Sequence, residues 1–169
     1  RQQRNGEWIE HAVLHASQRR VGILGLGALG RAAAETLRDQ GFAVAGWSRS
    51  PKSIEGVECF HDGPGGRGLD ALLERSDIVV NLLPHTDATT GLLGAGSFAL
   101  MLAGSSLINF GRGPTIDDDA LLAALDGPSP SSEPAGRGPT SGAHIDHAVL
   151  DVFVAEPLRD DHPYWSHPR

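Results

Sequence analysis

An arginine stands between two glycines in the stretch LINFGRGP, residues 107–114. The apolar residues at the start of the stretch are typical of a buried strand, so Arg112 follows directly on the end of that strand. A planar guanidinium pairs bidentately with a carboxylate, and glycines on both sides leave room for a small ligand. Arg112 is therefore a candidate for binding a small anionic substrate.

A second pattern, GLGALG, has the spacing G-x-G-x-x-G at Gly25, Gly27 and Gly30. It follows an apolar strand, residues 21–24, and opens a helical pattern that Gly41 ends, which is the context in which this motif binds dinucleotides. The first glycine permits a tight turn, the second lets the backbone approach a pyrophosphate, and the third lets the helix pack closely on the strand. A strand–turn–helix corner without a ligand would not need all three.

The residues that end the next predicted strand, 42–48, indicate which dinucleotide binds. An NAD site usually has an Asp or Glu about twenty residues beyond the glycine motif, where it binds the ribose 2′-hydroxyl. This chain has Ser48 there, followed by Arg49 and, shortly after, Lys52. A carboxylate would repel a 2′-phosphate, whereas hydroxyls and a guanidinium bind it. The pattern favours NADP(H) over NAD(H); the alternative is a solvated basic loop.

Apolar stretches separated by helical ones indicate how these residues are positioned. Besides those named above, we predict strands at residues 57–60, 77–84, 105–110 and 147–153, and helices at 68–76, 96–101 and 118–125, the last of them capped by Asp117. Strands without apolar–polar alternation are typical of a parallel sheet that helices cover. We therefore predict an α/β fold, a doubly wound Rossmann sheet with helices on both faces.

Composition excludes several classes of protein. The 169 residues suit one domain, and a net charge of −7 argues against a nucleic-acid binder. No apolar run approaches membrane-spanning length. Cys59 is the only cysteine, so no intrachain disulfide can form, which suits a reducing cytoplasm. Residues 127–142 are rich in Pro, Gly and Ser and are expected to form a flexible surface insertion.

Taken in order, the stretches VGILGLGALGRA, WSRSPK, NLLPHT, LINFGRG, AVLDVFVAEPL and HPYWSHPR resemble the NAD(P)-binding domain of the D-isomer-specific 2-hydroxyacid dehydrogenases. Within that family they are most similar to the glyoxylate/hydroxypyruvate reductase A branch, over nearly the whole chain apart from 127–142. The resemblance implies an oxidoreductase that reduces small 2-oxo acids, such as glyoxylate or hydroxypyruvate, to 2-hydroxy acids by hydride transfer from NADP(H). It also implies a cytoplasmic, homodimeric parent protein.

The resemblance assigns a role to several positions. Arg112 matches the arginine that grips the carboxylate and carbonyl of the 2-oxo acid, and Glu156 matches the acid that pairs with the catalytic histidine. Asp151 matches the residue that holds the nicotinamide carboxamide, and Pro84 and Thr86 match a loop that lies along the cofactor. The expected cofactor-binding residues are Gly25, Gly27, Ala28, Leu29, Gly30, Ser48, Arg49, Ser50, Lys52, Leu83, Pro84, Thr86, Phe110, Gly111 and Asp151.

The chain also departs from the family pattern. In the family the catalytic histidine follows shortly after the stretch that resembles HPYWSHPR, whereas this sequence stops at Arg169. His162 and His167 match other positions and are not expected to be the acid. Residues 1–20 match a connecting segment from a substrate domain, and 21–169 match the NAD(P)-binding domain. We therefore expect a part of a longer protein that binds NADP(H) weakly and turns over essentially nothing by itself.

Rival functions fit the residues less well. A short-chain dehydrogenase needs Tyr-x-x-x-Lys, but Tyr164 is followed four residues later by Pro168. Lys52 lies in the predicted cofactor loop, which argues against catalytic-lysine hydroxyacid dehydrogenases. The HIDH stretch, 144–147, has loose spacing for a metal site, and no metal is expected. The remaining alternative is a dinucleotide-binding module that senses redox state or binds partners without turnover.

Overall fold

The structure, a computed structural model, describes residue 6 and residues 14–63, 66–127 and 145–169. Of the insertion predicted at 127–142, all but Gly127 lies outside the described residues, as does most of the segment predicted at 1–20. The end of that segment forms a short 3-10 turn, η1 (Ala16–Gln18), which leads into the first strand.

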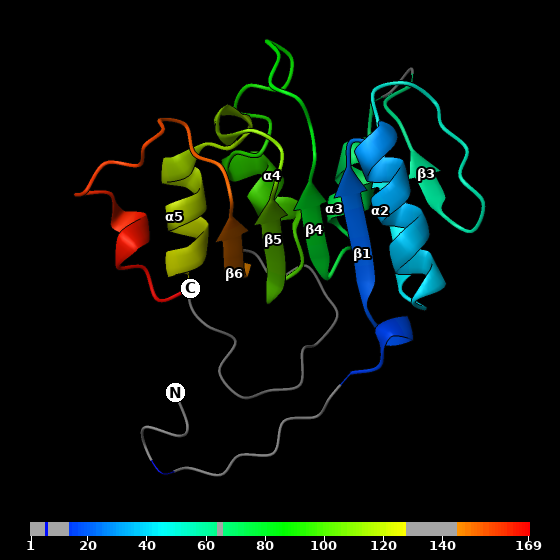
Figure 1. Cartoon of the computed structure of the whole chain (residues 1–169), viewed down its shortest axis with the longest axis horizontal. Coiled ribbons are helices and arrows are strands. Elements are labelled where there is room, and N and C mark those ends of the chain that lie inside the picture. Colours follow the sequence, from blue (N-terminus) through cyan, green and yellow to red (C-terminus); the bar gives the residue numbers. More distant parts are fainter. Residues whose placement is uncertain (1–5, 7–13, 64–65, 128–144) are drawn as a thin grey trace.

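A six-stranded sheet forms the centre of the described chain (Figure 1). Its order is β3-β2-β1-β4-β5-β6, and every neighbouring pair runs parallel. The strands are β1 (Arg20–Leu24), β2 (Ala43–Trp47), β3 (Glu58–Phe60), β4 (Ile78–Asn81), β5 (Ser105–Asn109) and β6 (Ile145–Leu150). The order reverses direction between β1 and β4, which is where doubly wound sheets bind ligands. The prediction of a Rossmann sheet is confirmed.

Helices cover both faces of the sheet, as predicted, but unequally (Figure 1). The helix α2 (Ala28–Asp39) lies on one face, against β1 and β2. The other face carries α3 (Gly68–Leu73), α4 (Ala95–Leu100) and α5 (Asp118–Asp126). Two 3-10 turns, η2 (Gly113–Thr115) and η3 (Pro163–Trp165), complete the described elements.

The two faces bury separate apolar cores, which explains why the sheet is nearly continuous in apolar residues. On the α2 face, Val21, Ile23 and Ala34 are buried. The larger core on the other face contains the fully buried side chains of Leu72 and Phe98, together with residues of α5. Each fully buried side chain of leucine size contributes about 1.5–3 kcal/mol. Because all six strands run parallel, their carboxyl ends lie at one edge of the sheet.

Two strands end three residues earlier than predicted. The strand predicted at 77–84 ends at Asn81, because the amide of Leu83 turns to the Asn81 side chain instead of continuing the ladder. The strand predicted at 147–153 spans Ile145–Leu150. After one further backbone bond, from Asp151 N–H to the carbonyl of Asn109, the chain leaves the sheet.

Candidate functional site

A crevice of about 390 Å³ opens at the carboxyl edge of the sheet, around the loops that follow β1, β2 and β4. This is the switch point of the strand order, the expected place for a ligand in such folds. Its lining residues are Gly25, Leu26, Gly27, Trp47, Ser48, Arg49, Lys52, Asp62, Leu83, Pro84, Thr86, Ala88, Thr89 and Leu92. Eight of the predicted cofactor-binding residues therefore lie together. The other predicted site residues, which do not line it, are Ala28, Leu29, Gly30, Ser50, Phe110, Gly111, Arg112, Asp151 and Glu156.

The glycine turn at the base of the crevice has the geometry that the motif requires. Gly25 has φ +99°, and a Cβ there would lie 3.1 Å from the carbonyl oxygen of Leu82. A Cβ at Gly30 would overlap the carbonyl oxygen of Gly25, so only glycine lets α2 approach the turn this closely. At Gly27 a Cβ would meet nothing within 4 Å. Open space at the amino end of α2, whose first amides lack a side-chain cap, suits a phosphate.

Two cations line the crevice beside this turn. Arg49 and Lys52 are both exposed, and neither takes part in an ion pair within the described part of the chain. Ser48, by contrast, is buried, and its hydroxyl donates to the carbonyl of Ser50 over 2.7 Å. Ser48 thus fixes the turn that presents Arg49, rather than offering its proton to a ligand.

An acidic residue that sequence reasoning missed also lines the crevice. Asp62 follows β3, and its Oδ1 accepts the amides of Gly68, over 2.9 Å, and Leu69, over 3.3 Å, at the start of α3. It therefore ties the loop after β3 to that helix. No local capping pattern marked it, because its bonds reach amides six and seven residues further along the chain.

Threonine side chains order the loop that forms the far wall. Thr89 Oγ1 donates to the carbonyl of Pro84 over 2.8 Å and accepts the amide of Thr86 over 2.8 Å. His85 contacts Thr90 through Nε2 and Oγ1, 2.9 Å apart. These local bonds hold Pro84 and Thr86 in place along the crevice.

Arg112 follows β5 at the same edge of the sheet. Its guanidinium is exposed, donates to the carbonyl of Gly111 over 2.7 Å, and forms none of the ion pairs found among the described residues. The flanking glycines serve another purpose than predicted. A Cβ at Gly111 would lie 2.7 Å from the carbonyl oxygen of Leu83, and one at Gly113 would overlap the backbone of Phe153. Both glycines admit neighbouring backbone, which corrects the expectation that they leave room for a ligand.

Beneath Arg112 lies a buried polar network that sequence reasoning also missed. Asn81, Asn109 and Thr115 are fully buried. Asn81 Nδ2 donates to Asn109 Oδ1 over 2.9 Å and to Thr115 Oγ1 over 2.7 Å. Thr115 Oγ1 in turn donates to the carbonyl of Arg112 over 2.6 Å. The available signal was an asparagine near the end of each of two apolar strands.

Asp151 and Glu156 lie after β6. Asp151 is exposed, and its backbone amide donates to the carbonyl of Asn109 over 3.1 Å. Glu156 is exposed, and its Oε1 accepts the amide of Phe153 over 3.0 Å. Among the described residues Glu156 has no histidine partner. Its predicted catalytic role therefore stays a prediction.

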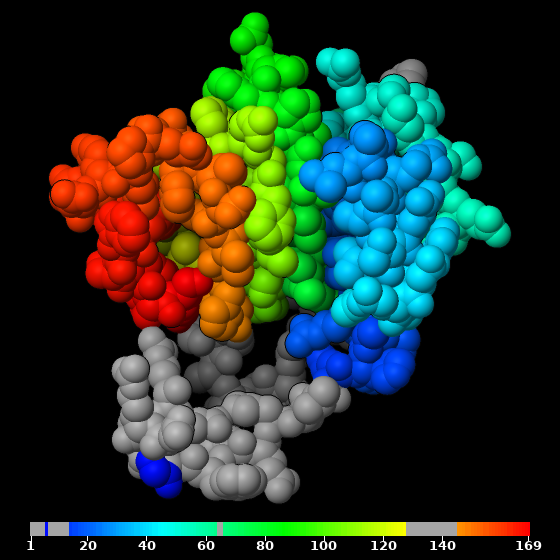
Figure 2. Space-filling view, in the orientation of Figure 1, coloured from blue at the N-terminus to red at the C-terminus, as the bar shows by residue number. Residues whose placement is uncertain are grey.

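Leu29 and Phe110 contribute to a different surface. Both were expected to bind the cofactor; Leu29 is 67% exposed, and Phe110 is 50% exposed. Their side chains belong to an apolar hollow of about 440 Å³ beside α2, on the face that Figure 2 shows. Its other lining residues are Val21, Ala33, Leu37, Phe42, Ile78, Val80, Leu82 and Ile108.

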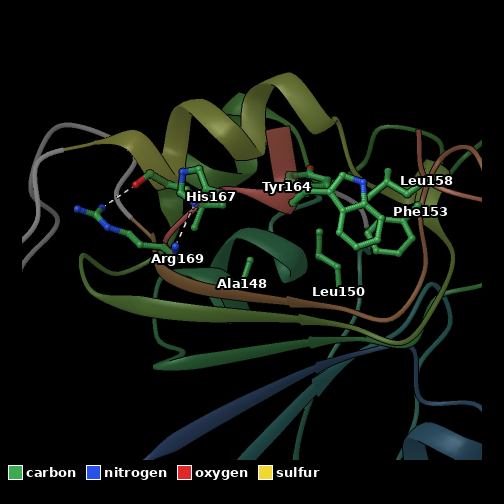
Figure 3. Close-up of a pocket in the computed structure, with 9 residues that line it drawn as sticks. Ala148, Leu150, Phe153, Leu158, Tyr164, His167 and Arg169 are labelled. Carbon is green, nitrogen blue, oxygen red and sulfur yellow. Dashed lines mark hydrogen bonds between the residues drawn. The ribbon is translucent and has the colours of Figure 1, made fainter. Parts of the chain in front are cut away.

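A third hollow, of about 250 Å³, lies between α5, β6 and the last residues of the described chain (Figure 3). Tyr164 donates its hydroxyl proton to Asp118 over 2.8 Å; burial and this bond raise the pKa of Tyr164. His167 contacts Asp126, with Nε2 and Oδ1 3.2 Å apart, and His162 lies near Asp118. Neither histidine lines the crevice. Both fasten the C-terminal residues to α5.

Two kinds of feature are absent from the described residues. No group of three or more metal-ligating side chains occurs among them, although His144 of the HIDH stretch lies outside the described range. None of their helices is both long and apolar enough to cross a membrane.

Comparison with known proteins identifies the family of the chain. Residues 1–129 match the family model described as D-isomer specific 2-hydroxyacid dehydrogenase, NAD binding domain. Glyoxylate/hydroxypyruvate reductase A of Yersinia enterocolitica is 40% identical over 149 residues, which cover 88% of this chain and 42% of that protein. The chain thus spans less than half the length of this relative.

Solved structures agree in fold as well as sequence. The D-isomer specific 2-hydroxyacid dehydrogenase of Xanthobacter autotrophicus, in complex with NADPH and MES, is 44% identical with a TM-score of 0.84, covering 98% of this chain and 61% of that one. The NADPH-dependent glyoxylate/hydroxypyruvate reductase of Sinorhizobium meliloti, in complex with NADP and sulfate, is 35% identical with a TM-score of 0.83, covering 98% and 48%. The chain therefore belongs to the D-isomer specific 2-hydroxyacid dehydrogenase family and carries its NAD-binding domain.

Proposed function

We propose that this chain is the cofactor-binding half of an NADP(H)-dependent reductase that converts small 2-oxo acids, such as glyoxylate or hydroxypyruvate, into 2-hydroxy acids. The observation that carries the proposal is the crevice at the switch point, where the glycine turn lies beside Arg49 and Lys52. The printed names of the relatives support it, since two of them are glyoxylate/hydroxypyruvate reductases and two solved relatives are bound to NADPH or NADP.

The residues of the crevice fit an NADP molecule. The open space at Gly27 and the uncapped amides of α2 would hold the pyrophosphate. Arg49 and Lys52 would bind the 2′-phosphate, which carries about −1.5 to −2 charges at neutral pH. When bound, the dinucleotide would supply the hydride that reduces the substrate carbonyl.

Arg112 is proposed to bind the substrate. Its exposed guanidinium has free donors besides the one given to Gly111, so it can pair bidentately with the carboxylate of a 2-oxo acid. This pairing would fix the orientation of the carbonyl carbon. Asp151 is proposed to accept a hydrogen bond from the nicotinamide carboxamide, and Glu156 to hold a proton-donating histidine in its charged form.

We also propose a setting for the full protein. The full protein would be a homodimer in the cytoplasm, a reducing compartment that suits a chain whose single cysteine, Cys59, can form no intrachain disulfide.

The substrate role of Arg112 is tested in the full-length reductase by following NADPH oxidation at 340 nm with glyoxylate. Arg112→Lys keeps the charge but loses the bidentate geometry, so kcat/KM should fall at least about tenfold. Arg159→Ala, which removes an exposed arginine paired with Asp161 over 3.4 Å, is the matched control and should change little. Full activity in Arg112→Lys and in Arg112→Ala would rule out this role.

A further inference from the structure

The loops that follow β4 and β5 are joined by side chains rather than by the sheet. Asn81 and Asn109 are register partners, and beyond them the amides of Leu83 and Gly111 no longer have ladder partners. Instead, Leu83 N–H donates to Asn81 Oδ1 over 3.2 Å, and Gly111 N–H donates to Asn109 Oδ1 over 3.1 Å. Each asparagine side chain thus supplies the hydrogen-bond acceptor that a neighbouring strand would otherwise provide, at the point where the crevice opens.

The bonding pattern permits only one orientation of the Asn81 amide. Its oxygen faces the Leu83 N–H, and its nitrogen faces two acceptors, on Asn109 and Thr115. Turning the amide over would set two donors against each other on one side and two acceptors on the other. Because all three side chains are fully buried, such a mismatch would be costly. A fully bonded, buried network of this kind holds one geometry.

The network ends on the backbone of Arg112. The Arg112 carbonyl accepts from Thr115 Oγ1 over 2.6 Å, from the Thr115 amide over 3.2 Å and, more weakly, from Asn109 Nδ2 over 3.4 Å. On the side of the crevice, Gly111 packs against the backbone of Leu83, which lines the crevice. The main chain of Arg112 is therefore tied to the wall of the crevice, while its guanidinium stays exposed.

We propose that Asn81, Asn109 and Thr115 are positioning residues, which hold the backbone of Arg112 in register with the cofactor loop after β4. This inference rests on the proposed substrate role of Arg112. It predicts that weakening the network lowers affinity for the 2-oxo acid while affinity for NADPH changes little, because none of the hydrogen bonds of the network involves Gly25, Gly27 or Arg49.

The first test uses the 169-residue chain and needs no activity. Thr115→Val removes the hydroxyl with little change in volume, and Thr115→Ser retains it. Ser76→Ala is the matched control, because Ser76 is buried at the opposite edge and donates its hydroxyl to the carbonyl of Leu72 over 2.6 Å. We expect the NMR signals of the Gly111 amide and the Arg112 Nε–H to move and broaden in Thr115→Val only. Unchanged signals would overturn the proposal.

The second test measures kinetics in the full-length reductase. Loss of a buried hydrogen bond to Thr115 should raise the KM for glyoxylate about tenfold, leave the KM for NADPH nearly unchanged, and be reversed in Thr115→Ser. An equal rise of both KM values, or no rescue by serine, would show a merely structural role and overturn the proposal. If Arg112→Ala itself leaves the KM for glyoxylate unchanged, the substrate role fails, and the NMR test alone decides whether the network positions Arg112.

Discussion

Removing the guanidinium of Arg49 should lower the affinity for NADPH and leave the affinity for NADH nearly unchanged. Arg49 lines the crevice, is exposed, and has no ion-pair partner among the described residues, so its charge is available to a 2′-phosphate. Hydrogen bonds to charged groups contribute about 1.5–3 kcal/mol, and solvent exposure favours the lower end of that range. Since about 1.4 kcal/mol corresponds to a factor of ten, Arg49→Ala should weaken NADPH binding about tenfold. NADH lacks the 2′-phosphate and should bind almost as before.

The assay is calorimetric titration of the chain with NADPH and with NADH, at 0.1 M and 1 M salt. The Debye length falls from about 10 Å to about 3 Å between these concentrations. The attraction between Arg49 and the 2′-phosphate is then screened more strongly, so the preference for NADPH should shrink at high salt. Lys52→Ala should act in the same direction, and Arg159→Ala, whose partner is Asp161, should have no effect. Equal losses for NADPH and NADH in Arg49→Ala would refute the 2′-phosphate site.

Two further predictions concern stability and are measured by urea unfolding. Burial raises the pKa of Asp77, but side-chain and backbone hydrogen bonds from Arg20 outweigh it and hold this pKa below its ordinary value of 3.8. The stability that this pair contributes is present above about pH 3.8 and is lost as the pH falls through the folded-state pKa. Asp77→Asn should therefore lower the free energy of unfolding by about 1 kcal/mol at pH 7 and by progressively less as the pH falls below 3.8; a loss that is the same at every pH would contradict this. Gly30→Ala should lower the free energy of unfolding by about 1–3 kcal/mol, because the added Cβ would overlap the Gly25 carbonyl oxygen. An unchanged urea midpoint would show that the turn can move to accept the methyl group.

The fold could be predicted because its signals are local. The apolar stretches, the glycine turn at Gly25 and the stop at Gly41, which has φ +90°, each depend on neighbouring residues. Asp117 was recognised as the cap of α5 for the same reason, and its side chain accepts the amide of Ala120 over 3.0 Å. The order of the strands in the sheet, by contrast, is not contained in such local patterns.

The parts of the site that were missed depend on contacts between distant residues. Asn81 and Asn109 bond to each other only because β4 and β5 pair in one particular register. The glycines beside Arg112 were assigned to a ligand because nothing in the sequence shows that Leu83 and Phe153 approach them. Exposure is equally non-local. Leu29 has the spacing of a core residue, but the part of α2 that carries it lies over an open hollow.

The most direct test of the cofactor site is NADPH titration of Gly27→Ala. Gly27 has φ −73°, and a Cβ there meets no atom within 4 Å, so alanine fits the protein alone. Alanine is less favourable than glycine at the N-cap of a helix, which lowers the stability by about 0.5–1 kcal/mol. It also stiffens the unfolded chain, which raises the stability by a similar amount, so the stability should hardly change. Gly96→Ala, on α4 and also with open space, is the control. We predict that Gly27→Ala alone weakens NADPH at least about tenfold, since the methyl group would occupy the path of the pyrophosphate. Wild-type affinity in a stably folded Gly27→Ala would contradict a dinucleotide site in this crevice.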